Sequence, residues 1–147
     1  MDRLKNPVSI LVAEDDDEYY GLLEEAMKEL AFSSRLERFV NGEDLLTFLQ
    51  QDKIREEKNT THLIILMDLN MPKKTGHEAL KEIRAIPSLR KIPIIIMTVS
   101  NDPRDIARCY ESGANSYITK PFDFEQLLKT FEIFKQYWFE KVQLPLN

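Results

Sequence analysis

The sequence predicts an α/β fold in which helices cover both faces of a parallel β-sheet. The prediction rests first on three continuous apolar runs, which are typical of strands buried on both faces. The runs are VSILVA at 8–13, LIILMDL at 63–69 and IPIIIMTV at 92–99. Segments with helical spacing of apolar residues separate these runs, and this alternation indicates a three-layer α/β/α sandwich.

The sequence also predicts two shorter strands, as well as two helices in the first third of the chain. The short strands are the alternating segment at 35–40 and SYIT at 116–119. Apolar residues recur at helical spacing over 22–30, and a second helix follows the turn at residues 41–42. The polar stretch at 50–61 either extends this second helix or leaves it.

The starts of the three later helices are marked by capping signals. TGHE at 75–78 has the pattern of a capping box, in which the first and last side chains each bond the other residue's main chain. Asp102 is expected to cap a helix that has Pro103 at its first position. Asp123 is expected to cap a last helix that runs to about residue 141.

Length and charge limit the classes of protein that fit. A chain of 147 residues predicts a single domain over 1–147, in which 124–147 form an extended last helix and a tail. The net charge of −5 argues against a nucleic-acid partner. No apolar stretch approaches the ~20 residues of a membrane span. The N-terminus shows no secretion signal and Cys109 is the single cysteine, so we expect a cytoplasmic protein without an internal disulfide.

Polar side chains follow four of the predicted strands, at the carboxyl edge where open parallel sheets bind their ligands. They are Glu14, Asp15 and Asp16 after the first strand, Asp68 after the third, Thr98 after the fourth and Lys120 after the fifth. If the first and third strands are neighbours, the carboxylates converge and repel, and a hard cation such as Mg²⁺ relieves this repulsion. A carboxylate can attack phosphorus, while a lysine and a hydroxyl stabilise the charge that develops, so this edge is suited to holding a phosphoryl group.

Four segments of the chain resemble the signature segments of the receiver domain of two-component response regulators. The segments are VAEDD, MDLNMPKKTG, IIIMTVS and YITKPF, and the resemblance covers about residues 8–130. It implies the flavodoxin-like receiver fold with strand order 2-1-3-4-5. It also implies a phosphoacceptor that assists only its own phosphorylation and dephosphorylation and is not an enzyme in the usual sense. No output domain follows the last predicted helix, so we expect a stand-alone response regulator that works by contact with another protein.

The resemblance implies a role for each strand-end residue. The implied Mg²⁺ ligands are Glu14, Asp15, Asp68 and the main-chain carbonyl of Asn70, and Asp68 is the phosphoacceptor. Thr98 and Lys120 are implied to bind the phosphoryl group, Tyr117 is the switch aromatic, and the Lys120–Pro121 bond is expected to be cis. Val99 departs from the family, which usually has a small residue at this position, and it predicts slower loss of the phosphoryl group.

The family's partner is a histidine kinase, and the response is a change in the surface formed by the fourth helix, fifth strand and last helix. The YW and VQLP segments near the C-terminus resemble small regulators that partner cyanobacterial phytochromes, which implies a phytochrome-type light-sensing kinase and a homodimer. An apolar stripe at 124–138 is expected to pack on the sheet. The predicted dimer interface consists of Ile133, Tyr137, Phe139 and Tyr110.

Three other interpretations fit parts of the pattern. A magnesium-dependent phosphatase of the haloacid dehalogenase kind needs a second aspartate at the position of Asn70. A flavodoxin-like nucleotide binder needs a phosphate-binding loop after the first strand, where this chain has the acidic segment EDDDEYY. A receiver-like interaction module that is never phosphorylated is the third. His62 and His77 are interpreted as surface residues without metal partners.

Overall fold

The computed structural model describes residues 7–51 and 61–146. Its strands are β1 Val8–Ala13, β2 Arg35–Phe39, β3 His62–Met67, β4 Ile94–Thr98 and β5 Ser116–Thr119. Each strand lies within two residues of its predicted bounds. The polar stretch at 50–61 falls mostly outside the described residues.

The described residues form five α-helices, each with a capping side chain at its start. They are α1 Asp17–Glu29, α2 Gly42–Leu49, α4 Gly76–Ala85, α5 Pro103–Glu111 and α6 Phe124–Lys135. The capping box of α4 is complete, with both reciprocal bonds between Thr75 and Glu78. Asp102 and Asp123 cap the next two helices as predicted. Gly113 follows α5 with a φ of 103°, a left-handed conformation that a residue without a Cβ adopts readily.

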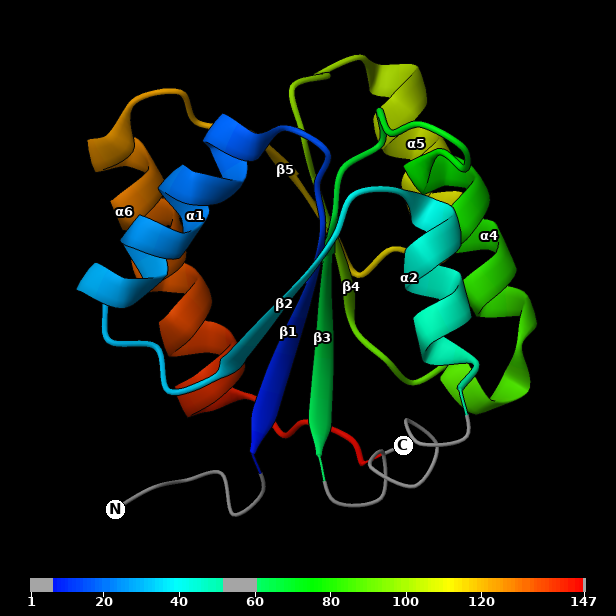
Figure 1. Cartoon of the computed structure of the whole chain (residues 1–147), viewed down its shortest axis with the longest axis horizontal. Coiled ribbons are helices and arrows are strands. Elements are labelled where there is room, and N and C mark those ends of the chain that lie inside the picture. Colours follow the sequence, from blue (N-terminus) through cyan, green and yellow to red (C-terminus); the bar gives the residue numbers. More distant parts are fainter. Residues whose placement is uncertain (1–6, 52–60, 147) are drawn as a thin grey trace.

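The five strands form one parallel sheet in the order β2-β1-β3-β4-β5, which confirms the predicted topology. Helices α1 and α6 cover one face of this sheet, and α2, α4 and α5 cover the other (Figure 1). Successive side chains of β1 enter opposite layers, with Leu11 packed under α2 and α4 and Ile10 packed under α1 and α6. The central strands are therefore buried on both faces, as their continuous apolar runs predict.

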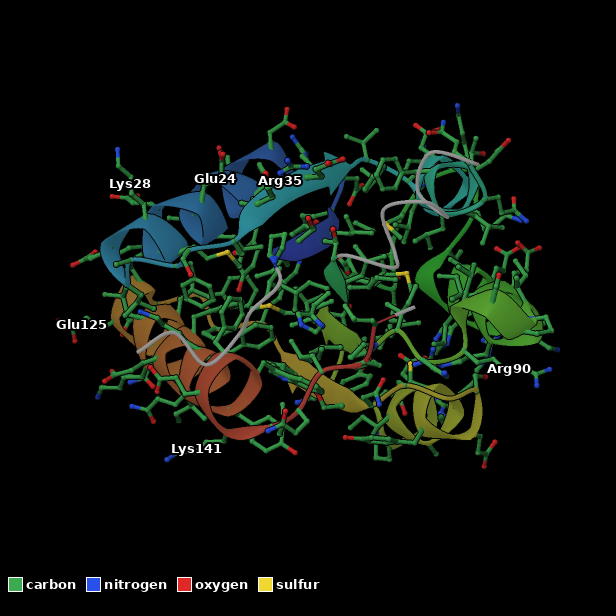
Figure 2. The ribbon with its side chains drawn as sticks, turned by 90° about the horizontal axis from the view of Figure 1, so that it is seen from below. Glu24, Lys28, Arg35, Arg90, Glu125 and Lys141 are labelled. Carbon is green, nitrogen blue, oxygen red and sulfur yellow. The ribbon has the colours of Figure 1, made fainter. Side chains whose placement is uncertain are left out.

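Many charged side chains lie on the outer surface of these layers (Figure 2). Figure 2, viewed from below the sheet, labels six that lie on the outside of the molecule: Glu24, Lys28, Arg35, Arg90, Glu125 and Lys141. Within the described residues, no helix combines the length and the apolar character that crossing a membrane requires.

The end of the last helix changes its periodicity and corrects one prediction. After α6 the chain continues as a π-helical segment, Gln136–Lys141, whose wider turn brings residues five apart onto the same side. Phe139 therefore follows Phe134 into the core, where its exposed fraction is 8% and its ring lies 5.3 Å from that of Phe32. The prediction that Phe139 belongs to an exposed interface is wrong, because it assumed the phase of an α-helix throughout. The stripe that includes Phe131 and Phe134 packs on the sheet as predicted.

The segment after the π-helix crosses the amino-terminal edge of the sheet (Figure 1). Leu144 packs against the α1–α6 layer, and a ring nitrogen of His62 lies 3.0 Å from the carbonyl oxygen of Pro145. His62 is consequently buried, with an exposed fraction of 7%. Its interpretation as a surface residue is wrong, because the tail that covers it is distant in sequence.

Candidate functional site

The candidate site lies at the carboxyl edge of the sheet, where β1 and β3 end side by side. The Asp68 amide donates to the carbonyl of Ala13 at 3.0 Å, so the two strand ends remain paired up to the site. Glu14, Asp15 and Asp68 each offer a carboxylate oxygen, and these oxygens lie within 4.8 Å of one another. The structure therefore brings together the carboxylates that the strand order predicted would converge.

Lys120 reaches this cluster from the end of β5. Its Nζ lies 2.5 Å from a Glu14 oxygen and 2.8 Å from Asp68 Oδ2. All three side chains are buried, with exposed fractions of 3% for Glu14 and 6% for both Asp68 and Lys120. A compact positive charge thus bridges two carboxylates in a site largely shielded from water.

The peptide bond between Lys120 and Pro121 is trans, so the expectation of a cis bond is wrong for this structure. The trans form is the lower in energy for most bonds before proline. Lys120 still points into the site because its amide donates to the Thr98 carbonyl at 2.7 Å and its ammonium group is held by the carboxylates.

Burial and charge act in opposite directions on the ionisable groups of this cluster. Burial raises the pKa of Glu14 to about 7, and the Asp68 charge adds to this effect while Lys120 opposes it. Burial alone would lower the pKa of Lys120, but its hydrogen bonds to Asp68 and Glu14 outweigh burial and raise it. Lys120 therefore stays charged, whereas Glu14 changes its charge near neutral pH when no metal is bound.

The loop after β3 holds Asp68 by its main chain. Asp68 Oδ1 accepts from the amide of Leu69 at 2.7 Å and from that of Asn70 at 3.3 Å, which leaves Oδ2 for Lys120. Gly76 packs directly on this loop, and a Cβ at that position would touch the Asp68 carbonyl and lie 2.8 Å from the Leu69 Cα. The loop is thus fixed from both sides, and the start of α4 depends on the absence of a side chain at residue 76.

The three acidic residues after β1 have different positions. Glu14 is buried in the site and Asp15 lies at its exposed rim. Asp16 does not join the cluster. Its carboxylate accepts hydrogen bonds from the amides of Glu18 and Tyr19 and so caps α1. Two of the three acids therefore contribute to the cluster, which agrees with the predicted metal ligands.

Thr98 ends β4, the strand that pairs with β3. Its side chain is fully buried, and in the described part of the chain its hydroxyl has no hydrogen-bond partner. A buried hydroxyl without a partner is costly, which favours a role as a donor to a group that arrives later. Tyr117 on β5 is half-buried, and its hydroxyl donates to the Ser100 carbonyl at 2.8 Å in the loop after β4.

Sequence reasoning missed two further groups. Tyr19 on α1 is buried, and the Lys120 Nζ lies 4.5 Å from the centre of its ring. His77, interpreted as a surface residue, is instead largely covered, with a ring nitrogen 3.2 Å from Asp105 on α5. The other oxygen of Asp105 accepts from the Ser100 hydroxyl at 2.6 Å, so this pair connects α4 to the loop that Tyr117 contacts. Only the packing of α4 on α5 reveals the contact.

A family model described as the response regulator receiver domain matches residues 10–132. The chain belongs to this family. The receiver domain is 35% identical over 144 residues to the response regulator Rcp1 of Synechocystis, covering 98% of this chain and 97% of that protein. It is 34% identical over 134 residues to the probable methanogenesis regulatory protein FilR2 of Methanothrix harundinacea, covering 91% of this chain and 85% of that one.

Solved structures agree with this assignment. The Mn²⁺-bound form of Rcp1 matches with a TM-score of 0.81 and 33% identity, over 95% of this chain and 99% of that one. The phosphorylated cyanobacterial phytochrome response regulator RcpA matches with a TM-score of 0.82 and 29% identity, over 93% of this chain and 97% of that one. Family membership favours a signalling receiver over the phosphatase and flavodoxin-like alternatives.

The donor set of the receiver domain fits a hard divalent cation. The clustered ligand atoms are all carboxylate oxygens, which suit Mg²⁺ or Mn²⁺ and do not suit a metal that prefers sulfur. The Asn70 amide donates to Asp68, which places Asn70 in the loop after β3, beside the cluster. Glu14, Asp15 and Asp68 would hold the ion.

Proposed function

We propose that this chain is a response regulator that accepts a phosphoryl group on Asp68 from a histidine kinase. The observation that carries the proposal is the buried cluster in which Asp68 meets Glu14 and Lys120 at the carboxyl edge of the sheet. In the reaction, an Asp68 oxygen bonds to phosphorus as the bond from phosphorus to the kinase's histidine breaks, and the histidine keeps the released electron pair. Mg²⁺ on the carboxylates would neutralise charge on the phosphoryl oxygens.

The residues of the chain then hold the transferred group. Lys120 offers its ammonium group to a phosphoryl oxygen, and the unpartnered Thr98 hydroxyl donates a second hydrogen bond. As Thr98 moves, Tyr117 leaves the Ser100 carbonyl and turns inward. The surface formed by α5, β5 and α6 changes as a result, which is a population shift driven by charge at one site. The proposal takes 1–147 as one cytoplasmic receiver domain, with 124–147 as its extended last helix and tail.

Intact mass after incubation with Mg²⁺ and acetyl phosphate tests the acceptor. We expect one phosphoryl adduct on the parent, none on Asp68→Asn, and none when EDTA is added first. Asp44→Asn changes an exposed aspartate on α2 and is the matched control, which should still form the adduct. An adduct on Asp68→Asn, or none on the parent with either acetyl phosphate or a kinase donor, would overturn the proposal.

The finer proposal is that the donor is a phytochrome-type light-sensing kinase. The similarity to Rcp1 over nearly the whole chain and to RcpA, which is named as a phytochrome response regulator, supports it. The similarity to FilR2 supports a different signal. Transfer from a purified autophosphorylated phytochrome kinase should be at least tenfold faster than from an unrelated histidine kinase, and equal rates would contradict this partnership.

We further propose that two copies associate through the surface formed by α5, β5 and α6. Ile133 and Tyr137 on the last helix and Tyr110 on α5 are exposed, at 66%, 53% and 49%. Ile133 and Tyr137 line a groove of about 460 Å³ between β5 and α6. The proposed interface does not include Phe139, because its side chain is buried.

The mass in solution, measured by light scattering, tests this association. The parent is expected at twice its 17.3 kDa chain mass, and Tyr137→Arg at the mass of one chain. Val40→Arg, which alters an exposed apolar residue beyond the end of β2, is the matched control and should remain a dimer. If the parent has the mass of one chain, the proposed dimer is refuted.

A further inference from the structure

Tyr19 joins α1 to the segment that carries Lys120. Its side chain is buried, with an exposed fraction of 5%, although its neighbours Glu18 and Asp17 are exposed. The Lys120 Nζ lies 4.5 Å from the centre of the Tyr19 ring, and the Tyr19 hydroxyl donates to the Pro121 carbonyl at 3.0 Å. One side chain therefore contacts both the ammonium group and the main chain next to it.

These contacts complete the environment of the ammonium group. An ammonium group has three N–H donors, and two carboxylates, on Glu14 and Asp68, already lie within hydrogen-bond distance. The face of the Tyr19 ring covers a further side, where the electron-rich ring attracts a cation. The pKa of Tyr19 is raised by burial and by the charges of Glu14 and Asp68, so its hydroxyl keeps the proton that it donates.

The main chain around Lys120 is held on both sides as well. Its own amide bonds the Thr98 carbonyl at 2.7 Å, and the next carbonyl, that of Pro121, bonds Tyr19. Because a lysine has a flexible four-carbon stem, the position of its charge depends on such contacts. Removing the Tyr19 contacts would free the stem and allow water to reach the ammonium group.

We propose that Tyr19 is a positioning residue for phosphoryl transfer, which holds Lys120 where the phosphoryl oxygens arrive. The proposal rests on the proposed acceptor function of Asp68. It predicts that Tyr19 acts on the transfer step through Lys120 and that its loss does not weaken metal binding. A purely structural role as a packed aromatic would loosen the whole site, and would weaken metal binding and transfer together.

Two measurements on the full chain separate these roles. The first is the maximal rate of adduct formation on the parent and variants, at saturating Mg²⁺ and acetyl phosphate. The second is the Kd of Mg²⁺ alone, by calorimetry without a phosphodonor. Tyr19→Leu removes ring and hydroxyl, and Tyr19→Phe removes only the hydroxyl. Tyr20→Phe is the matched control, since its ring faces Arg38 rather than Lys120.

The expected pattern is a slower transfer with undiminished metal affinity. Tyr19→Leu should lower the maximal rate about tenfold and Tyr19→Phe about threefold, from the usual strength of a buried cation–ring contact and a hydrogen bond. The Kd of Mg²⁺ should stay equal or become lower, because a mobile Lys120 competes less with the metal for the carboxylates. Tyr20→Phe should leave both quantities within about twofold.

Three results would overturn the proposal. They are unchanged rates in both Tyr19 variants, a Kd that rises in parallel with the loss of rate, and an equal loss in Tyr20→Phe. If Tyr19→Leu does not fold, Tyr19→Phe has nearly the same shape and the same criteria apply to it. A parent that forms no adduct refutes the acceptor function instead, so the two failures are distinguishable.

Discussion

Replacing Glu14 by Gln is expected to stabilise the metal-free protein at pH 8 while weakening its metal site. Glu14 is buried beside Asp68, and this position is unfavourable for a carboxylate unless a cation is present. A Gln side chain has nearly the same shape without the charge. Stability and function are therefore predicted to conflict at this residue.

The magnitude follows from the pKa of Glu14, which burial raises from 4.5 to about 7. The folded state then holds this proton more tightly than the unfolded state, so stability is lost as pH rises from about 4.5 through about 7. The full loss is about 3 kcal/mol above pH 7. Gln still accepts from Lys120 through its one oxygen, but its NH₂ group cannot accept the bond that the Asp16 amide donates to Glu14, which offsets about 1 kcal/mol. The net gain for Glu14→Gln is about 2 kcal/mol at pH 8 and close to zero near pH 5.

Urea unfolding followed by circular dichroism in EDTA, at several pH values between 5 and 8, measures this difference. Glu18→Gln is the matched control, because Glu18 is exposed and its replacement should change stability by less than about 0.5 kcal/mol. Adding Mg²⁺ should stabilise the parent more than Glu14→Gln. The reasoning is refuted if Glu14→Gln is less stable than the parent at pH 8, or if the difference is the same at pH 5.

Substitutions at Gly76, Phe139 and Val99, two of them with matched controls, test the packing of the fold and the chemistry of the site. Gly76→Ala should lower the free energy of unfolding by about 1–3 kcal/mol, because a Cβ there collides with the loop after β3. Gly21→Ala has open space around it and should raise the free energy of unfolding by about 1 kcal/mol. Urea unfolding measures both. Phe139→Ala should cost about 3 kcal/mol in the same assay, and Val40→Ala, at an exposed residue outside the proposed interface, less than about 0.5 kcal/mol. Equal costs would contradict the burial of Phe139. Val99→Ala should shorten the lifetime of the phosphoryl adduct, timed by intact mass, because less apolar surface then shields the end of β4 from water; equal lifetimes would contradict this.

Much of the architecture could be predicted because it is encoded locally. The apolar runs of β1, β3 and β4 show burial on both faces, and the capping residues Thr75 and Asp123 mark where helices begin. Since parallel strands present their carboxyl ends at one edge, the position of Asp68 after β3 already predicted a site there. The resemblance of four short segments then supplied the strand order.

The sequence by itself determined the fold class and which residues gather at one edge of the sheet, because periodicity and strand ends are local properties. Tertiary structure alone decided the contacts between distant segments. Tyr19 meets Lys120 only because α1 packs beside the end of β5, and His77 meets Asp105 only because α4 packs on α5. A π-helical turn sets the burial of Phe139, and apolar spacing does not reveal it. Such contacts depend on how whole elements pack, a property that no short segment contains.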